Sequence, residues 1–259
     1  VNDHDKATQY LYELTLQLLE LGGSDIFITA GSPPALKVNQ EIFRVGTRKL
    51  MPQQTTLLVR SIMQDRQSRE FDRCHEVNFS LHFPNLARFR VSAFTQRGSA
   101  GMVLRLIQQR IPTIEELNLP PMLKDIAMTK RGLLIFLGGT GCGKTTSMAA
   151  MLDHRNSECA EHIVTVEDPI EFYHRHKKSL VDQREVGTDT DSYEVALKNT
   201  LRQAPNVILI GECRDRETME AAINFAETGH QCMTTLHANN SDQAIDRIIN
   251  FFPEERRHQ

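Results

Sequence analysis

The feature that most constrains this chain is a glycine-rich loop at residues 138–145, which reads Gly-Gly-Thr-Gly-Cys-Gly-Lys-Thr. The loop fits the pattern G-x-x-x-x-G-K-[S/T]. An apolar run at 132–137 precedes it and is typical of a buried strand, whereas residues 146–152 are typical of the first turns of a helix. A strand, a glycine loop and a helix in this order predict a phosphate site, because backbone N–H groups in the loop and the helix N-terminus attract anions.

Each part of the loop has an expected task. We expect Lys144 to reach the β- and γ-phosphates of a nucleotide and the Thr145 hydroxyl to ligate Mg²⁺. The glycines let the backbone approach an anion closely, since a Cβ would obstruct that approach. The residues expected to bind the nucleotide are Gly138, Gly139, Thr140, Gly141, Cys142, Gly143, Lys144, Thr145 and Thr146. The alternative is a glycine-rich turn with a chance lysine, and the flanking strand and helix weigh against it.

Composition narrows the class of protein. The net charge of −3 gives no general attraction to nucleic acid. The sequence has no apolar run of roughly 18 residues and no apolar secretory core at its beginning, so we expect neither a transmembrane segment nor a signal peptide. The 5 cysteines are odd in number and form no C-x-x-C pair, which argues against a disulfide framework or a zinc site. A cytoplasmic location is therefore expected.

Residues 1–107 are predicted to form a small α+β domain. Leucines at helical spacing predict a helix over 4–21, and Pro52 stands where a second helix can begin. Residues 88–94 alternate polar and apolar side chains, so that Arg88 and Arg90 share one face of a strand. The further strands are expected at 24–28, 35–38, 42–45, 76–81 and 101–107.

Residues 122–259 show a different pattern, in which apolar strands alternate with helices. A proline-bearing stretch at 108–121 has little hydrophobic periodicity and is predicted to be a linker. The alternation predicts an α/β fold with a mostly parallel sheet covered by helices. Strands are expected at 133–137, 162–166, 207–210 and 232–235, with helices after the glycine loop, at 192–203, at 215–227 and from 240.

Acidic residues follow two of these strands, where a parallel sheet binds its ligands. Glu167 and Asp168 come after the 162–166 strand and would face bound phosphates, although a solvated acidic loop remains the alternative. Glu212 comes after the 207–210 strand and is expected to orient the attacking water, since the acid that holds magnesium at this place is usually Asp. The charges at 214–217 are interpreted as the solvated face of a helix.

Histidines and arginines supply further candidates. His230 and His237 flank the 232–235 strand, and they are either structural or sensitive to the γ-phosphate. Their spacing does not suit zinc. Arg90 and Arg105, with Arg88, are either solvated and paired or act as cations brought to the γ-phosphate from another domain or subunit. The second possibility requires a ring of subunits.

Several segments resemble one family in matching order. GGTGCGKTT, VTVEDPIEF, NVILIGECRDRET and AETGHQCMTTLHANN resemble the phosphate loop, Asp box, second acidic strand and His box of secretion and pilus ATPases. The whole chain is similar to the type IV pilus retraction ATPases of the PilT/PilU family. RFRVSAFTQRGSAG and DRIINFFPEERR resemble the PilU branch most closely, and the PilT branch is the near alternative.

The resemblance implies a homo-hexameric ring whose subunits carry a PAS-like N-terminal domain and a RecA-like ATPase domain, with ATP bound where the two domains meet. It makes Glu212 the general base or water-orienting residue and places Glu167 by the metal and the water. The His box would contain His230 and His237. The resemblance also implies that Arg90 and Arg105 approach the phosphates, with Arg88 and Arg97 as weaker candidates.

The resemblance has two departures. The extra N-terminal domain and four-cysteine metal insert of the assembly ATPases are missing from this sequence, which favours retraction. Family members continue well past the PEERR segment, so a chain ending at Gln259 is expected to be a truncated or incompletely covered form.

The first functional hypothesis is a Mg²⁺-dependent ATP-hydrolysing motor for pilus retraction and twitching motility. Its domains would rotate about 108–121, at the cytoplasmic side of the inner membrane, with a PilT-type paralogue and a membrane platform protein as partners. The second is a nucleotide-binding accessory subunit that docks on a paralogous motor and has little activity. A small-molecule kinase or GTPase is a third, for which the sequence offers no N-K-x-D motif and no obvious lid.

Overall fold

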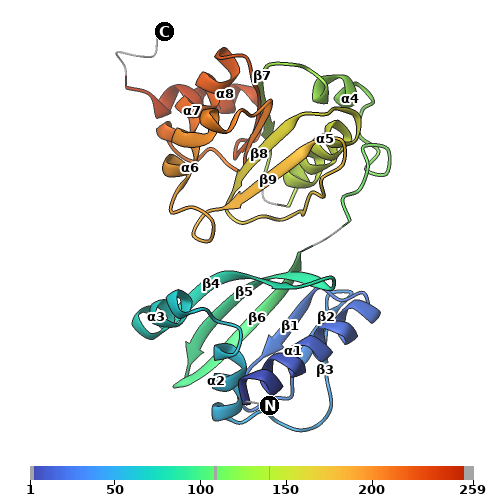
Figure 1. The fold of residues 1–259 in the computed structure, drawn as a ribbon, viewed down its shortest axis with the longest axis vertical. Coiled ribbons are helices and arrows are strands. Elements are labelled where there is room, and N and C mark those ends of the chain that lie inside the picture. The colour runs from blue at the N-terminus through green and yellow to red at the C-terminus, as the bar shows by residue number, and fades with distance from the viewer. Residues whose placement is uncertain (1–2, 108–109, 140, 254–259) are drawn as a thin grey trace. The chain divides into compact units, whose positions relative to one another are not determined.

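The computed structural model describes residues 3–107, 110–139 and 141–253. It divides into two compact units, residues 1–107 and residues 108–259, here called unit 1 and unit 2 (Figure 1).

Unit 1 is built on an antiparallel sheet with helices packed against it (Figure 1). The strand order is β3-β2-β1-β6-β5-β4. The strands are β1 (Asp25–Ile28), β2 (Ala35–Val38), β3 (Glu41–Arg44), β4 (Glu76–Phe83), β5 (Ala87–Gln96) and β6 (Ser99–Ile107). Phe89, Val91 and Ala93 of β5 are fully buried, and Arg90 and Ser92 are exposed, which confirms the predicted alternation.

The helices of unit 1 are α1 (Asp3–Glu20), α2 (Pro52–Arg60) and α3 (Asp65–Cys74). Helix α1 buries Leu11, Leu14 and Leu18 against the core, and these leucines recur at the spacing that predicted the helix. Helix α3 was not predicted. Its sequence is strongly polar and Phe71 is its one buried residue, so the apolar periodicity that marks a packed helix is missing.

Unit 2 contains a five-stranded sheet with the order β7-β11-β10-β8-β9. The strands are β7 (Gly132–Leu137), β8 (His162–Glu167), β9 (Leu180–Glu185), β10 (Val207–Ile210) and β11 (Gln231–Leu236). Every neighbouring pair is parallel, as the alternation of strands and helices predicts. Strand β9 was not predicted, because its sequence LVDQRE is mostly polar and lies at the sheet edge.

Helices cover both faces of this sheet. They are α4 (Met122–Ala127), α5 (Lys144–Glu158), α6 (Tyr193–Thr200), α7 (Arg216–Glu227) and α8 (Ser241–Phe251), with a 3₁₀ turn at Leu201–Gln203. Ile208 and Ile210 pack in the cluster that holds α6 and α7, whereas Val207 and Leu209 pack in the cluster that holds α5. Successive residues of β10 therefore serve opposite cores, as the period of a strand requires.

Part of the stretch predicted to be a linker packs against unit 2. Ile114 is buried in one cluster with Ala127, Ala150 and Met151, and Leu117 and Leu119 pack against the same cluster. The prolines of this stretch favour an irregular backbone, and such a backbone can still bury its apolar side chains, so the assignment of 108–121 as a linker stays a prediction.

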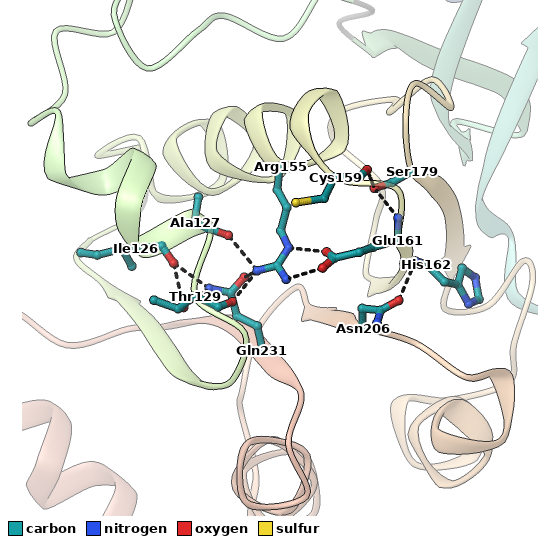
Figure 2. A network of polar contacts seen from close by, with 10 residues as sticks. All are labelled: Ile126, Ala127, Thr129, Arg155, Cys159, Glu161, His162, Ser179, Asn206 and Gln231. Atoms are coloured by element: carbon teal, nitrogen blue, oxygen red, sulfur yellow. Dashed lines mark hydrogen bonds and ion pairs between the residues drawn. The ribbon is translucent and has the colours of Figure 1, made fainter.

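A buried arginine ties together the sheet edge at which the strands begin (Figure 2). Arg155, in the last turn of α5, is 1% exposed and pairs with both carboxylate oxygens of Glu161, at 2.6 and 3.0 Å. It also donates hydrogen bonds to the carbonyl oxygens of Ala127 and Thr129 and, at 2.8 Å, to Oε1 of Gln231. One side chain thus joins α4, α5, β11 and the loop before β8.

Candidate active site

Four candidate groups meet at one edge of the sheet in unit 2. Because β7, β8, β10 and β11 are parallel and neighbouring, their carboxyl ends lie along the same edge. The 138–145 loop follows β7, Glu167 ends β8, Glu212 follows β10 and His237 follows β11. Sequence order alone predicted this edge as the site, since ligands of parallel sheets bind there.

The glycine loop closes around its own lysine. The Lys144 Nζ donates hydrogen bonds to the carbonyl oxygens of Gly138 at 2.9 Å and Gly139 at 2.8 Å. Gly138 has φ +145°, and a Cβ built there would collide with the Sγ of Cys142. Gly143 has φ +93° and caps α5, so that the helix begins at the lysine. These glycines hold a conformation that residues with side chains rarely adopt.

The loop residues suit the phosphates of a nucleotide with Mg²⁺. The conformation of the loop excludes a side chain at Gly138, and the N-terminus of the 15-residue helix α5 opens beside it. Lys144 would hold phosphate oxygens, Thr145 in the first turn would hold the metal, and Thr146 follows it. Thr140, also predicted to bind the nucleotide, lies outside the described residues.

Glu167 is a buried carboxyl group with raised proton affinity. Its side chain accepts hydrogen bonds from Thr165 Oγ1 at 2.6 Å and from Gln183 Nε2 at 3.1 Å. Burial, helped by the nearby charges of Glu171 and Glu185, raises the pKa of Glu167 to about 7, and this value includes the lowering effect of the two hydrogen bonds. A carboxyl group with such a pKa can accept or release a proton near neutral pH.

Glu212 is held by partners on both of its carboxylate oxygens. Arg214 Nε donates to Oε2 at 2.8 Å, and His237 Nε2 lies 3.1 Å from Oε1. The Glu212 side chain is 16% exposed, whereas that of Arg214 is 58% exposed. Arg214 is exposed, as the interpretation of residues 214–217 as a solvated face expects, but it lies before α7 and also pairs with Glu212.

Tyr193 is a second residue at this edge that the sequence did not single out. A Cβ built on Gly211 would stand 3.1 Å from the Tyr193 hydroxyl oxygen and 3.2 Å from the Glu167 Cα. Gly211 therefore lets the ends of β10 and β8 and the start of α6 come close together. Burial raises the pKa of Tyr193, as do the charges of Asp168 and Glu167, so the phenol stays protonated. A tyrosine opening a helix carries no sequence pattern that would mark it.

The structure does not bring His230 to this edge. His230 precedes β11, whereas His237 follows it, and a strand of six residues spans roughly 20 Å. The His230 Nδ1 lies 3.2 Å from both the Thr228 hydroxyl and the Phe225 carbonyl oxygen, at the end of α7. The two histidines were grouped because both flank β11, although the order of the sequence already puts His230 before the strand and His237 after it.

The two candidate arginines lie opposite each other in unit 1. Arg90 of β5 and Arg105 of β6 are cross-strand partners. Arg105 Nε forms an ion pair at 2.8 Å with Oδ1 of Asp25, whose side chain is 4% exposed. Arg90 is exposed, as a residue that meets a partner would be. A role for either arginine toward a nucleotide stays a prediction.

The fold and the loop together define a RecA-like P-loop domain of the α/β class, preceded by a smaller PAS-like α+β domain. Residues 2–256 match the family described as "Type II/IV secretion system protein". The chain belongs to this family, and within it to the PilT/PilU group of type IV pilus ATPases.

Two relatives from Pseudomonas aeruginosa support this assignment. The chain is 57% identical over 249 residues to the type IV pilus ATPase PilU, and the match covers 96% of this chain and 65% of PilU. It is 43% identical over 236 residues to the type IV pilus retraction ATPase PilT, and the match covers 91% of this chain and 69% of PilT. The chain thus spans about two thirds of the length of either relative.

Solved structures agree with the sequence comparison. A crystal structure of the pilus retraction motor PilT with bound ADP matches with a TM-score of 0.90 and 40% identity, over 95% of this chain and 72% of that one. The ATPase DotB of Legionella pneumophila matches with a TM-score of 0.83 and 28% identity, over 96% and 71% of the two chains. No helix in the described part of the chain combines the length and the apolar character of a membrane span.

Proposed function

We propose that this protein hydrolyses ATP with Mg²⁺ and that it does so as a motor of type IV pilus retraction. The observation that carries the proposal is the placement of the glycine loop and Glu212 at one sheet edge, with Lys144 inside the loop and Glu212 held from two sides. Membership of the PilT/PilU group supports the choice of ATP and of pilus retraction.

The residues divide the chemistry between them. The loop amides, the N-terminus of α5 and Lys144 would hold the phosphates, and Thr145 would hold the metal. Bound Mg²⁺ would offset negative charge on the phosphates. Glu212 would orient the water that attacks the γ-phosphate in line, and Glu167, with a pKa of about 7, would exchange protons at the same edge. His237 would hold Glu212 in place from its second oxygen.

The larger assembly is part of the proposal. Six copies would form a ring in which Arg90 and Arg105 of unit 1 approach the nucleotide, and movement of one unit against the other would do mechanical work. The ring would act at the cytoplasmic side of the inner membrane, with a PilT-type paralogue and a membrane platform protein. The relatives named as pilus ATPases support this arrangement.

Steady-state phosphate release by the purified protein tests the proposal. Replacing Glu212 with alanine should lower the rate by about 10²- to 10⁴-fold, the usual contribution of a positioned acid–base group. Glu217→Ala, an exposed acid in the first turn of α7, is the matched control and should change the rate less than twofold. Equal, near-background rates for the native protein and Glu212→Ala would contradict the proposal and favour an accessory subunit that binds nucleotide without turning it over.

A further inference from the structure

Four side chains link the ends of three neighbouring strands, and we call them the strand-tip chain: Asp168, Arg214, Glu212 and His237. Asp168 follows β8, Glu212 and Arg214 follow β10, and His237 follows β11. Arg214 Nη1 lies 3.9 Å from Asp168 Oδ2, and Arg214 Nε lies 2.8 Å from Glu212 Oε2. His237 Nε2 closes the chain at 3.1 Å from Glu212 Oε1. The cation of Arg214 thus stands between two carboxylates from different strands.

The backbone after β10 sets this arrangement. Residues 212–214 have no helical structure, and Cys213 is fully buried, with its Sγ 3.3 Å from the Thr234 hydroxyl. The Cys213 amide donates to the Thr235 carbonyl oxygen at 3.0 Å. Cys213 is fixed toward the interior, whereas Arg214 is exposed and Glu212 is partly exposed, and these two side chains meet each other.

The pair between Arg214 and Glu212 is better suited to orienting a side chain than to stabilising the fold. Arg214 is 58% exposed, and exposed ion pairs add little to stability. Glu212 has several rotatable bonds, and a carboxylate held at one oxygen only would rotate. With Arg214 on one oxygen and His237 on the other, the carboxylate keeps a single orientation. Catalysis by a positioned group depends on such pre-organisation.

We propose that Arg214 is a positioning residue that holds Glu212 in its working orientation. This inference rests on the proposed ATP hydrolysis. It predicts that Arg214 affects the chemical step and has little effect on nucleotide binding, because its ion pairs among the described residues are with acids at the strand tips.

The test compares two arginines of the same segment. Arg214→Gln removes the cation of the strand-tip chain, and Arg216→Gln removes a cation that pairs with Glu220 on α7 at 3.4 Å. We expect Arg214→Gln to lower kcat by about 10- to 100-fold, the effect of a small misplacement, with KM for ATP changed less than threefold. Arg216→Gln should change both by less than twofold. Arg214→Lys, which keeps the charge, should recover part of kcat, as a simple folding defect would not.

A double variant shows whether Arg214 acts through Glu212. In a Glu212→Gln background, adding Arg214→Gln should lower kcat by less than twofold further, because the group that Arg214 positions is already lost. The inference is overturned if Arg214→Gln lowers kcat as much in the Glu212→Gln background as in the native protein. It is also overturned if Arg214→Gln and Arg216→Gln have equal kcat. Either result leaves the proposed ATP hydrolysis intact. A native protein with only background hydrolysis overturns the proposed function and this inference together.

Discussion

Replacing Arg155 with methionine removes a charge that the fold encloses almost completely. The Arg155 side chain is 2% exposed, and it supplies hydrogen bonds to Glu161, to two backbone carbonyl groups and to Gln231 (Figure 2). Methionine has a similar length but donates nothing. Glu161 is 23% exposed and regains water, so the loss falls mainly on two acceptors that remain enclosed, the Ala127 carbonyl oxygen and Gln231 Oε1.

The magnitude follows from those contacts. Each acceptor left without a donor costs about 1–3 kcal/mol. Two such acceptors together cost about 2–6 kcal/mol. For a domain of this size each kcal/mol corresponds to about 2–4 °C. We therefore expect the melting temperature of unit 2 to fall by about 4–24 °C.

Thermal melting, monitored through hydrogen exchange at the amides of β7 and β11, measures the melting temperature of unit 2 alone. The matched control is Lys178→Met, which removes an exposed ion pair with Glu158 and should lower the melting temperature by at most about 3 °C. A fall no larger than the control's would refute the reasoning, because it would mean that water or the methionine replaces every contact of Arg155.

Two further predictions concern the nucleotide edge. Because burial raises the pKa of Glu167 from 4.5 to about 7, the folded protein binds this proton more tightly than the unfolded chain. Its contribution to stability is present at low pH and is lost as pH rises through about 4.5 to 7. As pH rises from 5 to 8, the free energy of unfolding of Glu167→Gln should therefore increase relative to that of the native protein, by roughly 3 kcal/mol at most. Urea unfolding at several pH values measures this difference. A difference that does not change with pH would contradict the raised pKa of Glu167. Gly138→Ala places a Cβ against Cys142 at φ +145° and should therefore weaken ATP binding by about 1–3 kcal/mol. Calorimetry measures this change. An unchanged affinity would contradict the claim that the loop needs glycine at this position.

Much of the fold could be predicted from the sequence wherever a strand or helix buries a regular apolar pattern. The β7 strand, the glycine loop and α5 were predicted because the motif and its flanks agree, and α1 because its leucines repeat every three or four residues. Helix α3 and strand β9 were missed because each is mostly polar, and their positions depend on neighbours far away in the sequence. The comparisons confirm the predicted fold class and family.

The site could be predicted as far as strand ends reveal it. Glu167, Glu212 and His237 do lie at one edge with the loop, since the ends of parallel strands converge. The order of the sequence already puts His230 before β11, and therefore at the opposite edge of a parallel sheet, so that error was avoidable. Sequence reasoning could not tell that Arg214 turns toward Glu212. That contact depends on the conformation of residues 212–214, in which Cys213 is buried. An acid and an arginine two residues apart after a buried strand would have been a usable sign.

The measurement that tests the central claim most directly is the effect of ATP and Mg²⁺ on thermal stability. At a hundredfold excess over the dissociation constant, binding should stabilise the native protein by about 2.7 kcal/mol, a rise of about 5–11 °C in melting temperature. Lys144→Ala should abolish this rise, and Lys130→Ala, an exposed lysine before β7, should retain it. No rise in the native protein, or an equal rise in Lys144→Ala, would contradict the assignment of residues 138–145 as the phosphate site.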